Sequence, residues 1–264
     1  GGSYLRDFVE CYEERDIVVF DTETTGLDVF ADDIVQIAAV KMRKGRVVPD
    51  SAFVAHLTTS REIPAMLGDI VNPIIEERKH HTLIANDEAL RQFMNYAEGA
   101  VLLAHNADYD YRILENNLRR YCPDISLEMQ HPHYLDSLRL VRLLHPELKE
   151  HKLKYLLGVF GLEGENSHLA DDDVNATCGV VAHCYEAAKE RLAEQQRFLS
   201  LEQTRRHASA LNNAYGAFYA EAIARKYVRR AADETPALVH ELLLFRQYLL
   251  DDGKIQPIDG FEHI

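Results

Sequence analysis

The feature that most constrains the fold is a short apolar run, Ile17-Val18-Val19-Phe20, which ends directly at Asp21-Thr22-Glu23. Consecutive β-branched and aromatic residues of this kind are typical of a strand that is buried on both faces. Residues i and i+2 of an extended chain point to the same side, so the two carboxylates can reach one cation. The sequence therefore predicts a buried strand that ends in a pair of carboxylates.

An Asp-X-Glu pair carries little information by itself, because such pairs are common in solvated loops. The position of this pair distinguishes it, since it follows a buried strand and precedes Thr24-Thr25-Gly26-Leu27, a turn that brings backbone close to a ligand. Two carboxylates held together repel each other unless a metal ion neutralises them. We therefore expect a metal site here.

The segments that follow predict a mixed sheet. Residues 34–42 and 47–57 have strand composition and are separated by a turn at 43–46, which indicates a three-strand meander. After an irregular polar stretch containing Pro64 and Pro73, residues 100–104 form another buried strand. Helices are expected at residues 88–96, 109–121, 135–144, 152–160 and 172–192. This pattern predicts an α/β fold, with a mixed five-stranded sheet flanked by helices.

Two further polar clusters lie after this first one. Asp110 follows a strand that runs out into His105-Asn106, and it opens the next helix, where an aspartate often serves only as the N-cap. His168 precedes three adjacent aspartates, 171–173, at the start of a strongly helical run, where acidic residues also complement the positive helix end. Taken singly, each cluster has this structural explanation.

Charge and cysteine content narrow the functional classes. The 264 residues carry a formal net charge of −14, which excludes a polycation that holds nucleic acid by bulk electrostatics. The four cysteines form no CxxC pair, and no apolar run is long enough to span a membrane. We therefore expect a reduced, soluble, cytoplasmic protein with no membrane partner.

Taken together, the clusters resemble the DEDDh (DnaQ-like) 3'-to-5' exonucleases, a family typified by the proofreading epsilon subunit of bacterial DNA polymerase III. The matching segments are Phe-Asp-Thr-Glu-Thr-Thr-Gly-Leu at 20–27, Ala-His-Asn-Ala-Asp-Tyr-Asp at 104–110, and His168 five positions before Asp173. Members whose base is tyrosine place it four residues before the last aspartate, where this chain has Leu169. The chain thus resembles the histidine subclass, over roughly residues 15–190.

The resemblance implies an RNase H-like fold and a site for two divalent cations, Mg²⁺ or Mn²⁺. Asp21, Glu23 and Asp173 would hold one ion, Asp21 would bridge to the second, and Asp110 would support that second ion. His168 would act as the general base, and the product would be a nucleoside 5'-monophosphate.

Substrate contacts are also implied. Thr24 and Leu27 match positions that embrace the terminal nucleotide, Leu27 as an apolar wedge against the base. His105 and Asn106 are further candidates, although either could instead fix local backbone. The family's short Gly-Ile-Thr-like turn is not recognisable at residues 68–73, so contacts from that turn are not transferred to this chain.

We expect residues 1–3 to be a cloning scar, residues 4–193 to form the exonuclease domain and residues 194–264 to form a helical extension. Three functions remain open. The first is a DNA exonuclease acting on a 3' end of single-stranded DNA, associated with a polymerase or helicase. The second is an RNA-trimming exonuclease, since the same metal core hydrolyses both polymers. The third is a non-catalytic binding module, against which the intact set of acidic residues argues.

Overall fold

The computed structural model describes residues 2–164 and 170–200. Residues 10–185 form one compact unit, and helices α1 (Gly2–Glu14) and α8 (Ala170–Ser200) each extend past its boundary. The expected extension at 194–264 lies outside the described residues except for its first seven, which end α8. The domain boundary at 193 therefore stays a prediction.

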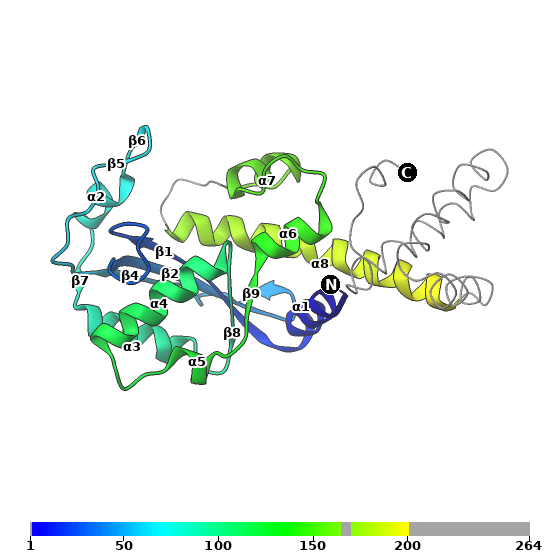
Figure 1. Cartoon of the computed structure of the whole chain (residues 1–264), viewed down its shortest axis with the longest axis horizontal. Helices are drawn as coiled ribbons and strands as arrows, with labels where there is room; N and C mark the ends of the chain where they lie inside the picture. Colours follow the sequence, from blue (N-terminus) through cyan, green and yellow to red (C-terminus); the bar gives the residue numbers. More distant parts are fainter. Residues whose placement is uncertain (1, 165–169, 201–264) are drawn as a thin grey trace, which may run out of the picture. The chain divides into compact units, whose positions relative to one another are not determined.

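The compact unit is built on a mixed sheet (Figure 1). Its central strand β1 (Asp16–Thr24) pairs antiparallel with β2 (Ile34–Arg43) and parallel with β8 (Val101–Ala104). Beyond β2 lies antiparallel β4 (Phe53–Leu57), and beyond β8 lies parallel β9 (Tyr134–Asp136). The expected mixed sheet is confirmed, although its last strand, β9, lies where a helix was expected to begin.

Among the described residues the sheet has seven strands rather than five. The two additional strands are two residues long: β3 (Arg46–Val47) pairs with β2, and β7 (Leu83–Ile84) pairs with β4. Strands this short show no alternation of polar and apolar residues, so the sequence could not reveal them.

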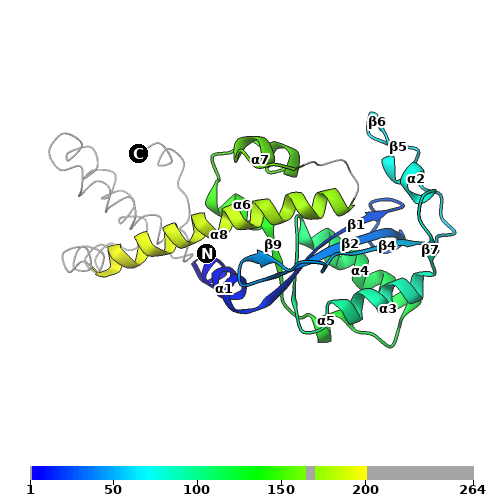
Figure 2. The same cartoon turned by 180° about the vertical axis from the view of Figure 1, so that it is seen from behind.

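Helices cover both faces of the sheet. Figures 1 and 2 show α3 (Asn86–Tyr96), α4 (Ala107–Tyr121) and α5 (Leu127–Gln130) on one side, with α6 (Ser137–Leu144), α7 (Leu153–Val159) and the start of α8 on the other. None of the described helices combines the length and the apolar character needed to cross a bilayer.

Two predicted elements were wrong in part. The strand expected at 47–57 is interrupted, because the chain turns at Pro49-Asp50, where Asp50 has a left-handed φ of 57° and proline offers no N–H. The helix expected at 135–144 begins only at Ser137. Asp136 ends β9 and caps α6, since its side chain accepts a hydrogen bond from the Leu138 N–H.

The stretch expected to be irregular, residues 58–87, contains short elements. A hairpin of β5 (Met66–Leu67) and β6 (Ile70–Val71) precedes helix α2 (Pro73–Arg78). Asn72 caps α2 by accepting from the Ile74 N–H, and Pro73 occupies the first helical position. Arg78 then donates to the carbonyl of Leu57 at 2.7 Å, which ties the end of α2 to the sheet.

We predict that Phe93→Ala lowers the free energy of unfolding by about 3–5 kcal/mol, because the truncation leaves a cavity in the core. The Phe93 ring is fully buried, with its centroid 5.6 Å from that of Phe20 and 5.7 Å from that of Phe53. Urea unfolding measures this change. The control is Phe30→Ala at a ring that is 65% exposed, where a change within about 0.5 kcal/mol is expected. Equal losses in the two variants would contradict the assignment of the core.

Candidate active site

The site is built around the C-terminal end of β1. This strand continues past its apolar run as far as Thr24, so Asp21 and Glu23 stay in an extended segment and point to the same face. On α8, Asp173 faces this pair, and the three residues have carboxylate oxygens that all lie within 4.8 Å of one another. The fold thus brings together residues that are 150 positions apart in the sequence.

Asp173 reaches the sheet because the start of α8 is fixed there. The Ala170 N–H donates to Gln36 Oε1 at 3.1 Å, and Gln36 lies beside Glu23 in the register of β1 and β2. Asp173 is buried in the first turn of α8, and Asp171 and Asp172 share that turn. The latter two residues complement the positive helix end, as expected.

Asp110 approaches β1 from the other side of the sheet. Asn106, with a left-handed φ of 72°, precedes the first residue of α4, so Asp110 lies within the first turn and is not the N-cap. The capping interpretation was therefore wrong. The Asp110 side chain is buried, and the Thr22 hydroxyl donates to its Oδ1 at 2.6 Å. This bond holds the carboxyl group against the strand that carries Asp21 and Glu23.

Burial and mutual repulsion make these carboxyl groups hard to ionise. Burial, followed by the charges of Asp110, Asp173 and Glu23, raises the pKa of Asp21 well above its usual range. Burial, followed by the charges of Asp173 and Asp110, raises the pKa of Glu23 to about 9. Burial raises the pKa of Asp110 to about 7, although the hydrogen bond from Thr22 acts in the opposite direction. The ionised forms of these carboxyl groups are therefore unfavourable unless a cation lies among them.

A divalent cation would supply the positive charge that favours ionised carboxyl groups. The cluster offers only carboxylate oxygens, which suit hard ions such as Mg²⁺ or Mn²⁺ better than softer metals. Bound positive charge would favour the ionised form of each carboxyl group and offset the repulsion among them. Asp21, Glu23 and Asp173 could hold one ion, and Asp110 lies near enough to Asp21 to raise its pKa.

His168, the candidate base, lies outside the described residues. Its position in the sequence is five residues before Asp173 and two before Ala170, where α8 begins in the structure. Its role therefore stays a prediction from the sequence.

The loop between β1 and β2, residues 25–33, is fixed by hydrogen bonds at its start. The hydroxyls of Thr24 and Tyr109 lie 2.6 Å apart, and both approach the Gly26 carbonyl oxygen, at 2.7 and 2.9 Å. A Cβ added to Gly26 would lie 2.5 Å from Asp32 Oδ2, so only glycine fits without a shift of the loop. Thr24 is thus held in place next to Glu23.

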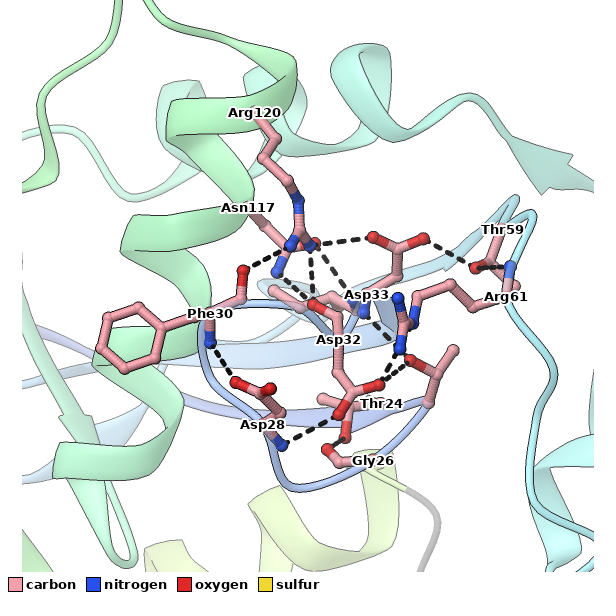
Figure 3. Close-up of polar contacts among 12 residues, drawn as sticks. Thr24, Gly26, Asp28, Phe30, Asp32, Asp33, Thr59, Arg61, Asn117 and Arg120 are labelled. Atoms are coloured by element: carbon pink, nitrogen blue, oxygen red, sulfur yellow. Dashed lines mark hydrogen bonds and ion pairs between the residues drawn. The ribbon is translucent and has the colours of Figure 1, made fainter.

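A polar network braces the rest of this loop (Figure 3). Arg120, from α4, donates to the carbonyls of Phe30 and Asp32 and to the Asp33 carboxylate, at 2.7, 2.7 and 2.9 Å. Asp32 accepts from the Asp28 N–H and pairs with Arg61. These contacts hold the loop in one conformation.

Leu27 lies within this braced loop, and its side chain is 88% exposed. An exposed leucine alone is ordinary, but this one is carried by a fixed loop beside the carboxylates. The structure thus presents an apolar side chain to solvent at the edge of the site.

The other two substrate candidates contact the protein. His105 has both ring nitrogens engaged, one 2.9 Å from Ser137 Oγ and the other 2.7 Å from the His151 carbonyl oxygen. The Asn106 N–H donates to Asp136 Oδ1 at 2.9 Å. The two ring contacts of His105 agree with the alternative that this residue fixes local backbone, whereas the bond from Asn106 involves only its main chain and assigns no role to its side chain.

Sequence reasoning missed the residues that position the site. Thr22 lies between two acidic residues that draw attention away from it, and Gln36 acts through its bond from the Ala170 N–H, 134 residues away in the sequence. Tyr109 precedes Asp110 directly, so an aromatic residue next to a candidate ligand was the available signal. Arg120 gave none, because its partners are 87 to 90 residues away in the sequence.

The sequence of this chain is similar to an exonuclease family and to segments of bacterial DNA polymerases. The sequence model of the exonuclease family RNase_T matches residues 18–181. The PolC-type DNA polymerase III of Clostridium perfringens is 32% identical over 179 residues, covering 68% of this chain and 12% of the polymerase. That of Latilactobacillus sakei is 36% identical over 176 residues, covering 66% of this chain. The chain spans only 11–12% of the length of these two relatives.

Solved structures resemble this chain in fold. Exonuclease I of E. coli in complex with a dT13 oligonucleotide has a TM-score of 0.55 and 20% identity, covering 72% of this chain and 45% of that enzyme. Cell-death related nuclease 4 has a TM-score of 0.54 and 13% identity, covering 66% of this chain and 64% of that nuclease. The expected RNase H-like fold is thereby confirmed.

We predict that Mg²⁺ raises the melting temperature of this chain more at pH 8.5 than at pH 6. The pKa of Glu23 is raised from its usual value near 4.5 to about 9, so the metal-free fold loses stability as pH rises through this interval. A bound cation displaces the retained protons, and its affinity therefore grows with pH. Thermal melts in EDTA and in MgCl₂ measure the difference.

The control for this prediction is Glu23→Gln, which removes a group that retains its proton, and the dependence of the Mg²⁺ effect on pH should shrink. An Mg²⁺ effect that is equal at both pH values in the unsubstituted chain would contradict the assignment.

Proposed function

This chain belongs to the RNase_T family of exonucleases, and on that premise we propose that it is a metal-dependent 3'-to-5' exonuclease releasing nucleoside 5'-monophosphates from DNA. The observation that carries the proposal is the convergence of four carboxyl groups at the end of β1, from Asp21, Glu23, Asp110 and Asp173. A binding module has no need for so many mutually repelling groups.

The carboxyl groups would divide between two ions. Asp21, Glu23 and Asp173 would hold the first, Asp21 would also serve the second, and Asp110 would support the second directly or through water. Two divalent cations about 3.5–4 Å apart stabilise the attacking and leaving oxygens of an in-line phosphoryl displacement. Thr22 keeps the Asp110 carboxyl group in place, and Gln36 keeps the start of α8 against the sheet.

His168 would take the proton from the attacking water. An unperturbed imidazole has a pKa near 6.5 and accepts a proton close to neutral pH. Support for this role comes from its spacing in the sequence, five residues before Asp173, which itself lies in the first turn of α8.

The braced loop would receive the terminal nucleotide. Leu27 would act as an apolar wedge against the base, and the backbone at Thr24 would contact the nucleotide. The high exposure of Leu27 on a fixed loop supports this role. His105 would contribute by positioning the end of β8, and the Asn106 side chain stays a candidate for contact with the substrate.

DNA is the favoured polymer because of the relatives. The similar segments come from DNA polymerases of the PolC type, at 32–36% identity, which also makes a polymerase the favoured partner. The net charge of −14 means that contact with the strand must be local or assisted by the cations.

We expect Asp173→Asn to reduce the rate of nucleotide release on the order of a hundredfold or more, because a ligand to the ion is weakened. Shortening of a 5'-labelled single-stranded oligonucleotide, with Mg²⁺ or Mn²⁺ present, measures this rate. The control is Asp172→Asn in the same helical turn, which should retain activity. An Asp173→Asn variant of normal activity would sink the assignment.

His168→Ala should reduce the rate by about 10²–10⁴-fold, the range that a general base contributes. Its melting temperature and its response to Mg²⁺ should be unchanged, since the cations are held by other residues. His133→Ala, at an exposed histidine elsewhere, serves as the control. Full activity in His168→Ala would remove this residue from the mechanism while leaving the carboxylate site untouched.

The choice of polymer is tested by comparing matched single-stranded DNA, RNA and mispaired duplex ends, each labelled at the 5' terminus. We expect faster degradation of DNA from the 3' end. A clear preference for RNA would overturn DNA as the substrate and favour an RNA-trimming exonuclease with the same metal chemistry.

A further inference from the structure

A second group of metal-ligating side chains lies apart from the carboxylates. His56, on β4, faces Glu77 and His81 at the end of α2, and the three residues offer ligand atoms that all lie within 4.8 Å of one another. Whereas the carboxylate cluster has only oxygen donors, this cluster has two imidazoles and one carboxylate.

His56 is the unusual member of the cluster. Its side chain is only 2% exposed, and neither of its ring nitrogens has a hydrogen-bond partner among the described residues. A buried polar group without a partner destabilises a fold by about 1–3 kcal/mol, and native structures contain few of them. The buried imidazole is therefore a group in need of a ligand.

The other two residues are held opposite His56 by the backbone. Glu77 and His81 are four residues apart, and His81 Nε2 lies 2.9 Å from Glu77 Oε1. Arg78, between them, donates to the Leu57 carbonyl, the residue after His56. Leu83 pairs with His56 across the edge of the sheet. The Arg78 side chain on one side of His81 and the pairing of β7 with β4 on the other thus hold this segment against β4.

From this geometry we propose that His56, Glu77 and His81 form a second metal site, for a divalent transition-metal ion of the zinc class. Two histidines and one glutamate are an established ligand set for zinc, which then keeps a fourth position for water. Magnesium is disfavoured, because imidazole nitrogen suits zinc-class ions better.

The protonation state of His56 favours binding. Burial lowers the pKa of His56 to about 4, so its ring is neutral near pH 7 and an ion need not displace a proton. His56 and His81 are now stacked, with ring centroids 4.2 Å apart, and parallel rings do not aim their lone pairs at one point. Coordination therefore requires the His81 ring to rotate, which its 43% exposed side chain permits.

This site is separate from the carboxylate cluster but lies on the same face of the sheet. Glu23, Gln36 and His56 occupy one row across β1, β2 and β4, so His56 is two strands, or roughly 10 Å, from Glu23. An ion bound there would fasten the end of α2 to β4. The proposed site does not depend on the proposed nuclease mechanism.

The test is Zn²⁺ binding by the full chain in the presence of excess Mg²⁺, with stoichiometry read by elemental analysis after dialysis. We expect one retained equivalent, and Co²⁺ in its place should give the absorption bands of a tetrahedral site. His81→Ala and Glu77→Gln change side chains that are 43% and 33% exposed, and unchanged melting temperatures without metal would show that both variants fold. Each should weaken Zn²⁺ binding about tenfold or more.

Two controls separate this site from its surroundings. His80→Ala removes a neighbouring histidine that is 69% exposed and pairs with Glu76, and it should retain the equivalent of zinc. Asp21→Asn combined with Glu23→Gln should also retain it, even if nuclease activity is lost. The proposal is overturned if the unsubstituted chain retains no zinc, if His81→Ala binds it normally, or if the carboxylate variant abolishes it.

Discussion

Four carboxyl groups converge where β1 ends, and those of Asp21, Glu23 and Asp110 resist ionisation because like charges are close and because the protein shields them from water. Asp21 experiences the charges of the other three, and the pKa of Glu23 rises to about 9. Without a cation this arrangement opposes folding near neutral pH, since an unfolded chain would release the same protons freely. The surrounding structure is best understood as a frame that holds these groups together until an ion neutralises them.

The frame consists of hydrogen bonds between elements far apart in the sequence. Thr22 joins β1 to α4 through Asp110, and Gln36 joins β2 to the first residue of α8. Arg120 fixes the loop that follows β1. Thr22 lies next to a candidate ligand and Gln36 lies opposite one in the sheet, whereas Arg120 acts on the loop from α4, so the candidate ligands are positioned largely by secondary structure. This rigidity is what a metal site with defined geometry requires.

Sequence patterns predicted most of the long elements, because buried strands and amphipathic helices have recognisable patterns, but helix α1 was not among them. The full set of candidate ligands was predicted by the resemblance to a known family. Sequence patterns failed where elements are two to six residues long, as between residues 58 and 87, and where one side chain decides a boundary, as Asp136 does before α6. They also could not separate a capping role from a buried one for Asp110, because that distinction depends on its bond to Thr22, 88 residues away. The cluster around His56 was equally hidden, since it depends on how the end of α2 returns to β4.

The most direct test of the cation's role is to count the protons that leave when an ion binds. Mn²⁺ titrated calorimetrically into the chain at pH 7, in two buffers with different ionisation enthalpies, yields that number. We predict net proton release on binding, with release reduced in Glu23→Gln and binding strongly weakened in Asp21→Asn. Binding without proton release, or with an affinity unchanged by Asp21→Asn, would contradict the claim that these carboxyl groups hold the cation.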